Sequence, residues 1–301
     1  MAPGKKSSHA LDQSCLYQLS NKRKLAKILH LSLKGLEALA QTEHRYQSWE
    51  EDKKSGGKRR IDAPHDNLKK AQKRISDLLQ RITPPDYLMA PVKRRSYVSN
   101  AAAHVGARAF RLLDIEDFFP SCTDKRVYWF FHTYMGCSKD VAALLTKLTT
   151  YKGQLPQGSP CSPILAFFAY VDMWEEINGI AKASNCKLSI YADDITLSGD
   201  VVYEKDVWNI KKCLFRFGHR YSERKERSLI DKPADITGVI VSGSELLLPN
   251  RQHKELARVK REFDRAKSGS ERAYLSRQIR GRKSQAGQIE NHLAKTSEKT
   301  G

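Results

Sequence analysis

Two adjacent aspartates between two alternating segments constrain this chain more than any other feature. In residues 188–198, apolar and polar side chains alternate on both sides of Asp193 and Asp194. Such alternation predicts a β-hairpin that carries the two carboxylates at its tip. The turn would contain Ala192 and Asp193, although relaxed two-residue turns favour Asn-Gly or Asp-Gly. A carboxylate pair in this place indicates a site for divalent metal ions, and a solvated acidic turn is the alternative that the pair alone leaves open.

The charge of the chain points to a polyanionic partner. Its 301 residues include 53 Lys and Arg against 34 Asp and Glu, a net charge of +19, which favours nucleic acid. The longest apolar run, 164–171, has eight residues, well short of the ~18 that a membrane-spanning helix needs. Because no apolar stretch follows the basic N-terminus either, we expect a cytoplasmic protein with no membrane partner. The six cysteines lack zinc-like spacing and are expected to be free buried thiols.

A third carboxylate lies at the end of a predicted buried strand. Residues 110–113 are largely apolar and lead directly to Asp114. A carboxylate where such a strand ends can face a metal ion together with Asp193 and Asp194. Three carboxylates can hold two Mg²⁺ ions about 3.5–4 Å apart, the arrangement that clamps the attacking and leaving oxygens in phosphoryl transfer. Mn²⁺ is a substitute for Mg²⁺ at oxygen ligands of this kind.

A basic hairpin is expected before this strand. Residues 45–64 contain Gly56-Gly57 between lysines and arginines, with Trp49 on one side and Pro64 on the other. Glycines in this setting predict a β-hairpin with a flexible cationic tip that can close over phosphates, and an ordinary solvated loop is the alternative. Residues 20–40 predict two short helices. These would pack against the rest of the chain, while a DNA-reading helix-turn-helix is the second interpretation.

The remaining segments are mostly helical. Pro156-Gln157-Gly158 predicts a turn, and Ser162 and Pro163 suit the N-cap and the first position of a buried helix that runs to about residue 180. A short strand is expected over 235–242. The other helices are expected at 67–82, 124–134, 141–151, 207–217 and, in a basic C-terminal segment, 251–293.

These motifs follow one another as they do in a known polymerase family. Asp114, then Pro156-Gln157-Gly158, then Tyr191-Ala192-Asp193-Asp194 have the order and approximate spacing of a reverse transcriptase palm, and the chain resembles a reverse transcriptase over residues 45–245. Within that family, Asn100-Ala101-x-x-His104 and Ile236-Thr237-Gly238 resemble the two signatures of bacterial retron reverse transcriptases. The run from Asp114 through Phe118-Phe119-Pro120-Ser121 is similar as well.

Three positions depart from the family pattern. Ile236 stands where the second signature has Val, and Phe167 stands where many relatives carry Asn. Residues 221–226 read Tyr-Ser-Glu-Arg-Lys-Glu, whereas the family tends to have Ile-Asn-x-x-Lys-Thr, so that only Lys225 matches.

The resemblance implies an α+β fold of the right-hand polymerase type, with an antiparallel palm sheet flanked by helices. It implies an N-terminal helical extension at 1–44, the first part of the fingers at 45–105 and a palm at 106–245 with a fingers insertion around 124–155. A basic helical thumb would follow at 246–301.

The resemblance also implies an activity. A retron RNA-directed DNA polymerase copies a cognate structured noncoding RNA, primed from a 2′-hydroxyl of an internal guanosine, into branched RNA-linked multicopy single-stranded DNA. The implied partners are this RNA, its RNA–DNA product, deoxynucleoside triphosphates and a separate effector protein of an antiphage defence system. The alternatives are another small bacterial reverse transcriptase, of the intron-encoded or diversity-generating type, and a non-catalytic nucleic-acid-binding scaffold.

Roles for individual residues come with the resemblance. Asp114, Asp193 and Asp194 are the expected catalytic residues and, with Ile115, the expected holders of two Mg²⁺ ions, and Lys225 is a candidate general acid. Phe119 matches the residue whose ring excludes a 2′-hydroxyl, and a core phenylalanine is the alternative. The expected nucleotide-binding set is Lys53, Lys54, Arg59, Phe118, Phe119, Gln157 and Gly158. The expected retron signature set would position RNA and the strand that ends at Asp114. It consists of Asn100, Ala101, His104, Ile236, Thr237 and Gly238.

Overall fold

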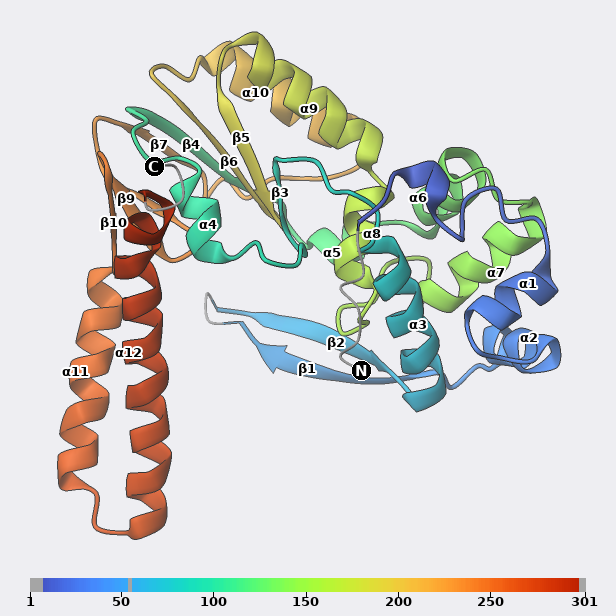
Figure 1. Ribbon diagram of the computed structural model, residues 1–301, viewed down its shortest axis with the longest axis horizontal. Coiled ribbons are helices and arrows are strands. Elements are labelled where there is room, and N and C mark those ends of the chain that lie inside the picture. Colours follow the sequence, from blue (N-terminus) through green and yellow to red (C-terminus); the bar gives the residue numbers. More distant parts are fainter. Residues whose placement is uncertain (1–7, 54–55, 298–301) are drawn as a thin grey trace. The chain divides into compact units, whose positions relative to one another are not determined.

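The computed structural model describes residues 8–53 and 56–297, with side chains described as far as His292. The chain divides into two compact units (Figure 1). The first unit contains Met1–Lys93, Ile115–Asn178 and Ile210–Tyr221, and the second contains Arg94–Asp114, Gly179–Asn209 and Ser222–Gly301. Within the described residues, no helix is long and apolar enough to cross a membrane.

The first unit contains the predicted basic hairpin. Strands β1 (Tyr46–Asp52) and β2 (Lys58–Pro64) pair antiparallel, with Asp52 opposite Lys58 next to the turn. Acidic side chains of β1 face basic ones of β2, and Glu51 pairs with Arg59 at 2.8 Å. Opposite charges on facing strands stabilise such a pair. The prediction of a hairpin is therefore confirmed, and its tip residues 54 and 55, including Lys54, lie outside the described residues.

Helices make up the rest of the first unit. Helices α1 (Lys22–Ile28) and α2 (Leu33–Gln41) both pack against α7 (Lys139–Thr149), as α3 (Asp66–Leu79) also does. The other elements are a 3₁₀ turn η1 (Leu11–Gln13), a short strand β3 (Leu88–Ala90), α5 (Phe118–Ser121), α6 (Asp124–Trp129) and a π-helical turn η2 (Phe130–Tyr134).

The predicted long helix after residue 162 is two helices. Helix α8 (Ser162–Phe168) has Ala169 as its C-cap, and α9 (Val171–Ala183) begins two residues after that cap. Ser162 is the first residue of α8, and Cys161 before it is the N-cap. The Ser162 hydroxyl donates a hydrogen bond to the carbonyl of Pro156 at 2.8 Å. Both predictions were therefore wrong in detail, although the expected burial is confirmed for nearly every residue of α8.

An antiparallel sheet organises the second unit. Strand β4 (Ala109–Asp114) lies between β6 (Asp194–Gly199) and β7 (Arg227–Ile230). Strand β5 (Lys187–Tyr191) pairs with the other side of β6. The predicted acidic hairpin and the predicted strand that ends at Asp114 are both confirmed. Helix α10 (Glu204–Arg216) follows β6 along the chain.

A smaller three-stranded sheet occupies the position of one predicted strand. Strands β8 (Ala234–Ile236), β9 (Val239–Ser242) and β10 (Glu245–Leu247) form a meander. The prediction of a single strand over 235–242 was wrong, because Thr237 and Gly238 form a turn with φ angles of 49° and 88° that separates β8 from β9. Apolar residues of this sheet form a core with α4 (Tyr97–Ala102), β4 and the last helix.

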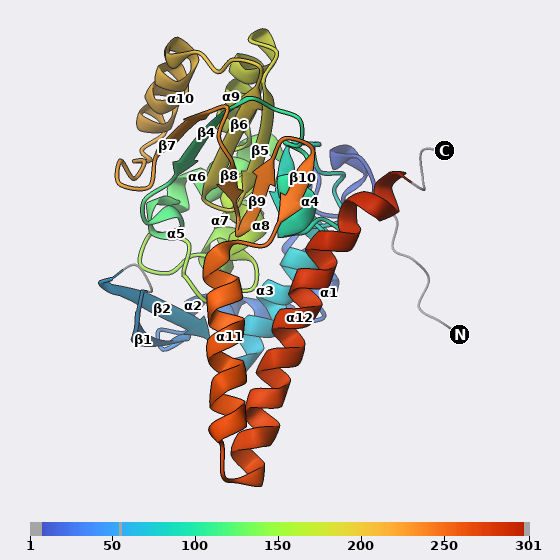
Figure 2. The same cartoon turned by 90° about the vertical axis from the view of Figure 1, so that its left-hand side faces the viewer.

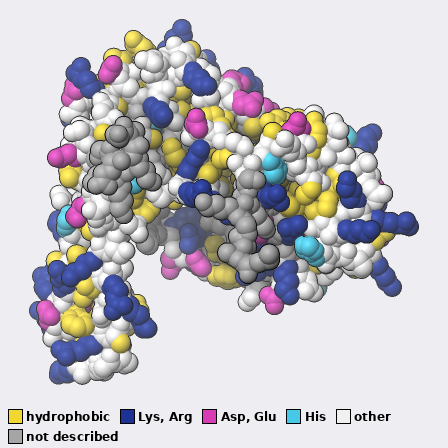
Figure 3. Space-filling view, viewed as in Figure 1, with side chains coloured by type: hydrophobic (Ala, Val, Ile, Leu, Met, Phe, Trp, Pro, Cys, Tyr) yellow, Lys and Arg dark blue, Asp and Glu magenta, His cyan; other side chains and the backbone are white. Residues whose placement is uncertain are grey.

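The basic C-terminal segment forms a helical hairpin. Helices α11 (Asn250–Arg265) and α12 (Gly269–Ser297) run side by side and antiparallel (Figure 2). Val259, Ala266 and Leu275 form a small apolar seam between them. Lys and Arg side chains gather over the hairpin surface (Figure 3), so the prediction of a basic helical segment is confirmed.

Candidate active site

Two of the three aspartates lie directly opposite each other on neighbouring strands. Asp114 is the last residue of β4 and Asp194 is the first residue of β6, and the two are paired in the antiparallel register. Residues paired in this way have Cβ atoms about 4.5–5.5 Å apart. Asp193 is in the turn immediately before Asp194. The fold therefore brings Asp114 close to Asp194, which lies 80 positions later in the sequence, and to the neighbouring Asp193.

The turn that carries Asp193 has an unfavourable backbone. Ala192, its first residue, has a φ of 57°. A non-glycine residue in the left-handed region costs about 1–2 kcal/mol. Strain of this kind persists where the surrounding structure enforces it, which is frequent at functional sites. The choice of Ala-Asp over the relaxed Asn-Gly is consistent with a functional demand for the acid.

Burial and mutual repulsion raise the pKa values of Asp193 and Asp194. Burial, followed by the neighbouring charges of Asp193 and Asp114, raises the pKa of Asp194 to about 7. Burial also raises the pKa of Asp193, and the charge of Asp114 adds to that effect. Carboxylates that repel one another in a partly desolvated place are stabilised by a nearby cation.

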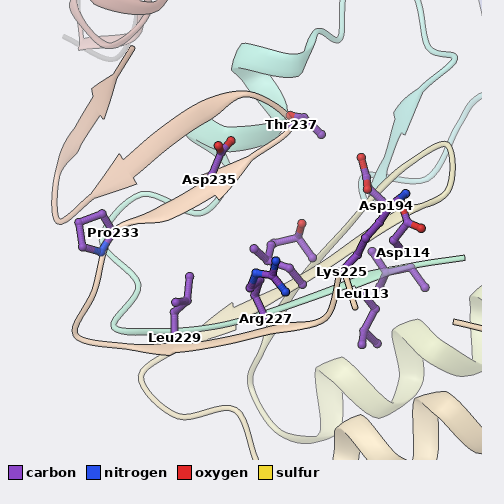
Figure 4. Close-up of a pocket in the computed structure, with 12 residues that line it drawn as sticks. Leu113, Asp114, Asp194, Lys225, Arg227, Leu229, Pro233, Asp235 and Thr237 are labelled. Carbon is purple, nitrogen blue, oxygen red and sulfur yellow. Dashed lines mark hydrogen bonds and ion pairs between the residues drawn. The ribbon is translucent and has the colours of Figure 1, made fainter. Parts of the chain in front are cut away.

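Lys225 supplies one such cation. Its Nζ donates a hydrogen bond to Oδ2 of Asp114 at 2.7 Å (Figure 4). Burial lowers the pKa of Lys225, but the hydrogen bond to Asp114 and the charges of the three aspartates outweigh this, so the pKa lies above its ordinary value. Lys225 is thus a protonated group among the carboxylates.

The donor set fits a hard divalent cation. Mg²⁺ prefers carboxylate oxygens and keeps several water ligands, so a few carboxylates suffice. Within the described part of the chain, no three His, Cys, Asp or Glu side chains are arranged to hold one ion as they stand. Asp114 is turned to Lys225 instead. A rotation of the Asp114 side chain away from Lys225 would free its oxygens for an ion shared with Asp194.

A pocket of about 440 Å³ extends from these residues along the second unit. Arg227, Asp235 and Thr237 line it beyond Lys225, from β7 and the β8–β9 hairpin (Figure 4). Asp235 also pairs with Arg251 of α11. The pocket therefore combines charges of both signs with apolar side chains such as Leu113 and Leu229.

His104 has a structural position behind the acidic hairpin. Its Nδ1 contacts Oγ of Ser198 and its Nε2 contacts Oγ of Ser189, each at 2.7 Å, so that it joins β6 to β5. The side chain is buried, and burial lowers the pKa of His104 to about 3. The neutral imidazole of His104 holds β5 to β6, the two strands of the hairpin whose tip carries Asp193 and Asp194.

The other signature residues hold α4 against the β8–β9 hairpin. Asn100 Nδ2 donates to Oγ1 of Thr237 at 3.2 Å, and that hydroxyl donates to the carbonyl of Tyr97 at 3.2 Å. Ala101 and Ile236 are buried in the core of the second unit. Gly238 has the positive φ that the turn requires, and its amide donates to Asp235. Both sequence signatures therefore meet in one hydrogen-bonded cluster.

The expected nucleotide-binding residues lie in the first unit. Lys53 Nζ pairs with Asp117 at 3.2 Å, and Arg59 pairs with Glu51. The carbonyl of Gln157 accepts the amide hydrogen of Asp62 at 2.7 Å. Gly158 has a φ of 128°, and a Cβ there would lie 2.9 Å from the carbonyl oxygen of Asp62. A close approach of β2 is thus the structural reason for this glycine.

The segment after Asp114 is partly engaged by backbone pairing. Ile115 is buried and forms an antiparallel bridge with Tyr221, and the amide of Glu116 donates to the carbonyl of Arg220 at 2.8 Å. The Glu116 amide is therefore bound within the backbone of the first unit. Phe118 is buried against Trp174, whereas Phe119 is only half-buried.

Sequence reasoning missed the residues that hold Phe118 and Phe119. Ser121 contacts His219 across 98 positions of sequence, and Tyr170 contacts the same short helix. Ser121 belongs to the run from Asp114 to Ser121 that resembles the reverse transcriptase family, so the sequence did mark this residue. No sequence pattern marks His219, because its role arises from tertiary packing alone.

A family model described as reverse transcriptase (RNA-dependent DNA polymerase) matches residues 52–226, more than half of the chain. The chain belongs to the reverse transcriptase family. The predictions of an RNA-directed DNA polymerase and of a bacterial retron type are thereby confirmed.

Curated relatives of this reverse transcriptase are retron enzymes. The Retron Ec86 reverse transcriptase of Escherichia coli is 29% identical over 247 residues, which cover 79% of this chain and 76% of that protein. The Retron Se72 reverse transcriptase of Salmonella heidelberg is 35% identical over 148 residues, which cover 49% of this chain and 39% of that protein. The chain therefore spans most of the first relative and about two fifths of the second.

A solved structure shares the fold of this reverse transcriptase. The telomerase from Candida albicans, in complex with a TWJ fragment of telomeric RNA, superposes with a TM-score of 0.51 at 11% identity. The match covers 72% of this chain and 50% of the telomerase chain. Together with the family match, this confirms the α+β fold of the right-hand polymerase type.

Proposed function

We propose that this reverse transcriptase copies a cognate structured noncoding RNA into branched, RNA-linked single-stranded DNA, primed from the 2′-hydroxyl of an internal guanosine. The retron relatives support this proposal. The observation that carries the catalytic part is the pairing of Asp114 with Asp194 across β4 and β6, with Asp193 in the adjoining turn. Such an arrangement provides the carboxylates that phosphoryl transfer requires.

Asp114, Asp193 and Asp194 would bind two Mg²⁺ ions, for which Mn²⁺ is a substitute. When bound, the ions activate the primer hydroxyl and neutralise charge on the triphosphate and the leaving pyrophosphate. Lys225 is the proposed general acid, which donates a proton from Nζ to the pyrophosphate. Its raised pKa keeps it protonated at neutral pH, and its contact with Asp114 keeps it beside the carboxylates.

Residues of the first unit are proposed to bind the incoming deoxynucleotide. Lys53 and Arg59 contact the triphosphate through charge-assisted hydrogen bonds. Gln157 contacts the nucleotide through its amide, and the half-buried ring of Phe119 excludes a 2′-hydroxyl. The proposed fingers at 45–105, palm at 106–245 and thumb at 246–301 provide these roles and the grip on the template.

The α11–α12 hairpin is proposed to hold the RNA–DNA duplex. Its Lys and Arg side chains suit contacts with phosphates (Figure 3). Such contacts make binding fall steeply with salt, by up to about 0.9 in log K per log unit of salt for each phosphate neutralised on a duplex. The resulting DNA, with this enzyme and a separate effector protein, would act in antiphage defence.

Isolation of the nucleic acid that copurifies with the enzyme tests this function. After RNase treatment, the wild-type complex should retain a short DNA of one sequence, and Asp193→Ala should retain none. Asp200→Ala removes an exposed aspartate outside the hairpin tip and should behave as the wild type. Equal nucleic acid in all three proteins would support a non-catalytic scaffold, and DNA of many sequences would point to another small bacterial reverse transcriptase.

A further inference from the structure

Phe119 lies in a helix too short to hold its own position. Helix α5 (Phe118–Ser121) has four residues and follows Asp117, whose φ is 42°. Among the described residues, no side chain caps the start of this helix. A single turn that begins from a left-handed residue has little intrinsic stability. The location of the Phe119 ring must therefore depend on contacts from outside α5.

A buried polar network supplies these contacts. The hydroxyl of Ser121 donates to the carbonyl of Phe118 at 2.9 Å, so its oxygen accepts the hydrogen on Nδ1 of His219 at 2.8 Å. The hydroxyl of Tyr170 donates to the carbonyl of Ser121 at 3.1 Å and accepts the amide hydrogen of Thr123 at 3.2 Å. The C-terminal end of α5 is therefore fixed by side chains from two distant segments, and Ser121 carries that restraint back to Phe118.

His219 is well placed for this purpose. It is fully buried, and its ring lies 4.3 Å from that of Tyr170 and 5.8 Å from that of Phe118. Burial lowers the pKa of His219 to about 4, so the ring is neutral at physiological pH. Because Ser121 has already given its hydrogen to Phe118, the neutral ring carries its own hydrogen on Nδ1. This tautomer satisfies the bond to Ser121, while Nε2 of His219 is buried without a hydrogen-bond partner among the described residues.

The network is connected to Phe119 through Phe118. The Phe118 ring contacts both the ring of Trp174, at 6.3 Å, and the half-buried ring of Phe119, at 5.6 Å. The Phe118 carbonyl is also the acceptor of the Ser121 hydroxyl. Loss of the bond between Ser121 and His219 would let α5 move, and the Phe119 ring would move with it.

We propose that Ser121 and His219 are positioning residues that fix the Phe119 ring and so set the discrimination between deoxynucleotides and ribonucleotides. This rests on the proposed function, in which Phe119 excludes the 2′-hydroxyl. The ring excludes a single oxygen atom only if it is held to within a fraction of an ångström, and a loose ring makes room for that oxygen.

Single-nucleotide incorporation on a primed RNA template tests the proposal. The measured quantity is the ratio of kcat/KM for a deoxynucleotide to kcat/KM for the matching ribonucleotide. Ser121→Ala and His219→Phe should each lower this ratio at least tenfold. His219→Asn retains an N–H donor near the place of Nδ1 and should restore most of the ratio. The double variant Ser121→Ala/His219→Phe should be no worse than either single variant, because the two changes remove the same bond.

Thr149→Ala is the matched control. Thr149 is fully buried in the same unit, and its hydroxyl donates to the carbonyl of Leu145 at 2.8 Å. Its loss should leave the ratio unchanged. An unchanged ratio in folded Ser121→Ala and His219→Phe, or an equal fall in Thr149→Ala, would overturn the proposal.

The same assay separates this proposal from the proposed function. If the wild type makes no DNA, the proposed function fails. If the wild type makes DNA and Phe119→Ala accepts ribonucleotides while Ser121→Ala and His219→Phe do not, only the positioning role fails. If Phe119→Ala leaves the ratio unchanged, both the exclusion role of Phe119 and the positioning role fail, whereas DNA synthesis stands.

Discussion

The ammonium of Lys225 lies 2.7 Å from Oδ2 of Asp114, the carboxylate that faces Asp194 across the sheet. The pair has two consequences. It places a proton donor beside the proposed site of pyrophosphate release, and it occupies an oxygen that a metal ion would use. Lys225 and a divalent cation are therefore expected to compete for Asp114, so that the metal-loaded enzyme has a Lys225 side chain free to act.

Substitution of Lys225 separates these roles. Lys225→Met should lower kcat about 10²-fold, because it removes the proton donor. Lys225→Arg retains the positive charge, but guanidinium has a pKa above 12 and gives up its proton poorly, so kcat should remain low. Rapid-quench measurements of one nucleotide addition would report this. Recovery of the wild-type rate in Lys225→Arg would show that charge alone matters and would contradict the acid role.

The raised pKa of Asp194 predicts a pH-dependent stability. Its folded-state pKa, about 7, lies above the ordinary value of 3.8. The folded protein therefore binds more protons than the unfolded chain between these values, and this contribution to stability is lost as the pH rises through about 7. Without metal, the fall in Tm from pH 5.5 to pH 8 should be about 3–8 °C larger in the wild type than in Asp194→Asn.

Mg²⁺ should reverse this loss. Because the proposed site holds the ion through ionised carboxylates, Mg²⁺ should raise the wild-type Tm more at pH 8 than at pH 5.5. Thermal melts in EDTA and in Mg²⁺ at both pH values provide the measurement. Asp200→Asn, which changes an exposed aspartate, should respond as the wild type does. An equal response to Mg²⁺ in Asp194→Asn would show that the ion binds elsewhere.

The ion pair with Asp117 restrains Lys53, which is a proposed ligand of the triphosphate. Both side chains are more than one third exposed, so the pair is worth at most about 1 kcal/mol. Asp117→Asn removes the charge while Asn tolerates the left-handed backbone at this position. Freed from its partner, Lys53 should bind triphosphate better, and KM for deoxynucleotides should fall by about 2–5-fold.

Asp140→Asn is the control for this change. Asp140 is an exposed acid of the same unit that pairs with Lys22, and its loss should leave KM unchanged. A KM that does not fall in Asp117→Asn, or that falls equally in Asp140→Asn, would exclude Lys53 as a triphosphate ligand that Asp117 restrains.

The sequence predicts the strand that ends at Asp114 and the acidic β5–β6 hairpin because the signals for both are local. Alternation of apolar and polar residues around Asp193 identifies the two strands of the hairpin, their buried face and the position of the turn. The apolar run before Asp114 identifies a buried strand and its end. The break between α8 and α9 was missed, because apolar residues continue across it. The contact of Ser121 with His219 was out of reach as well, since it joins segments 98 residues apart that only the tertiary fold brings together.

Gly158 shows how a motif residue can have a structural cause that the sequence does not disclose. Gly158 belongs to the expected nucleotide-binding set, but its close neighbour in the structure is the carbonyl oxygen of Asp62, which would lie 2.9 Å from a Cβ on residue 158. With a φ of 128° as well, any side chain is strained here. Gly158→Ala should therefore lower the free energy of unfolding by about 1–3 kcal/mol even without substrate.

Gly179→Ala is the matched comparison for Gly158→Ala. Gly179 lies inside α9, where a Cβ would meet nothing within 4 Å, and alanine in a helix interior is favoured over glycine by up to about 1 kcal/mol. The two substitutions add the same methyl group but should shift a urea unfolding midpoint in opposite directions. If Gly158→Ala kept full stability and lost only nucleotide affinity, the glycine would serve the nucleotide and not the approach of β2.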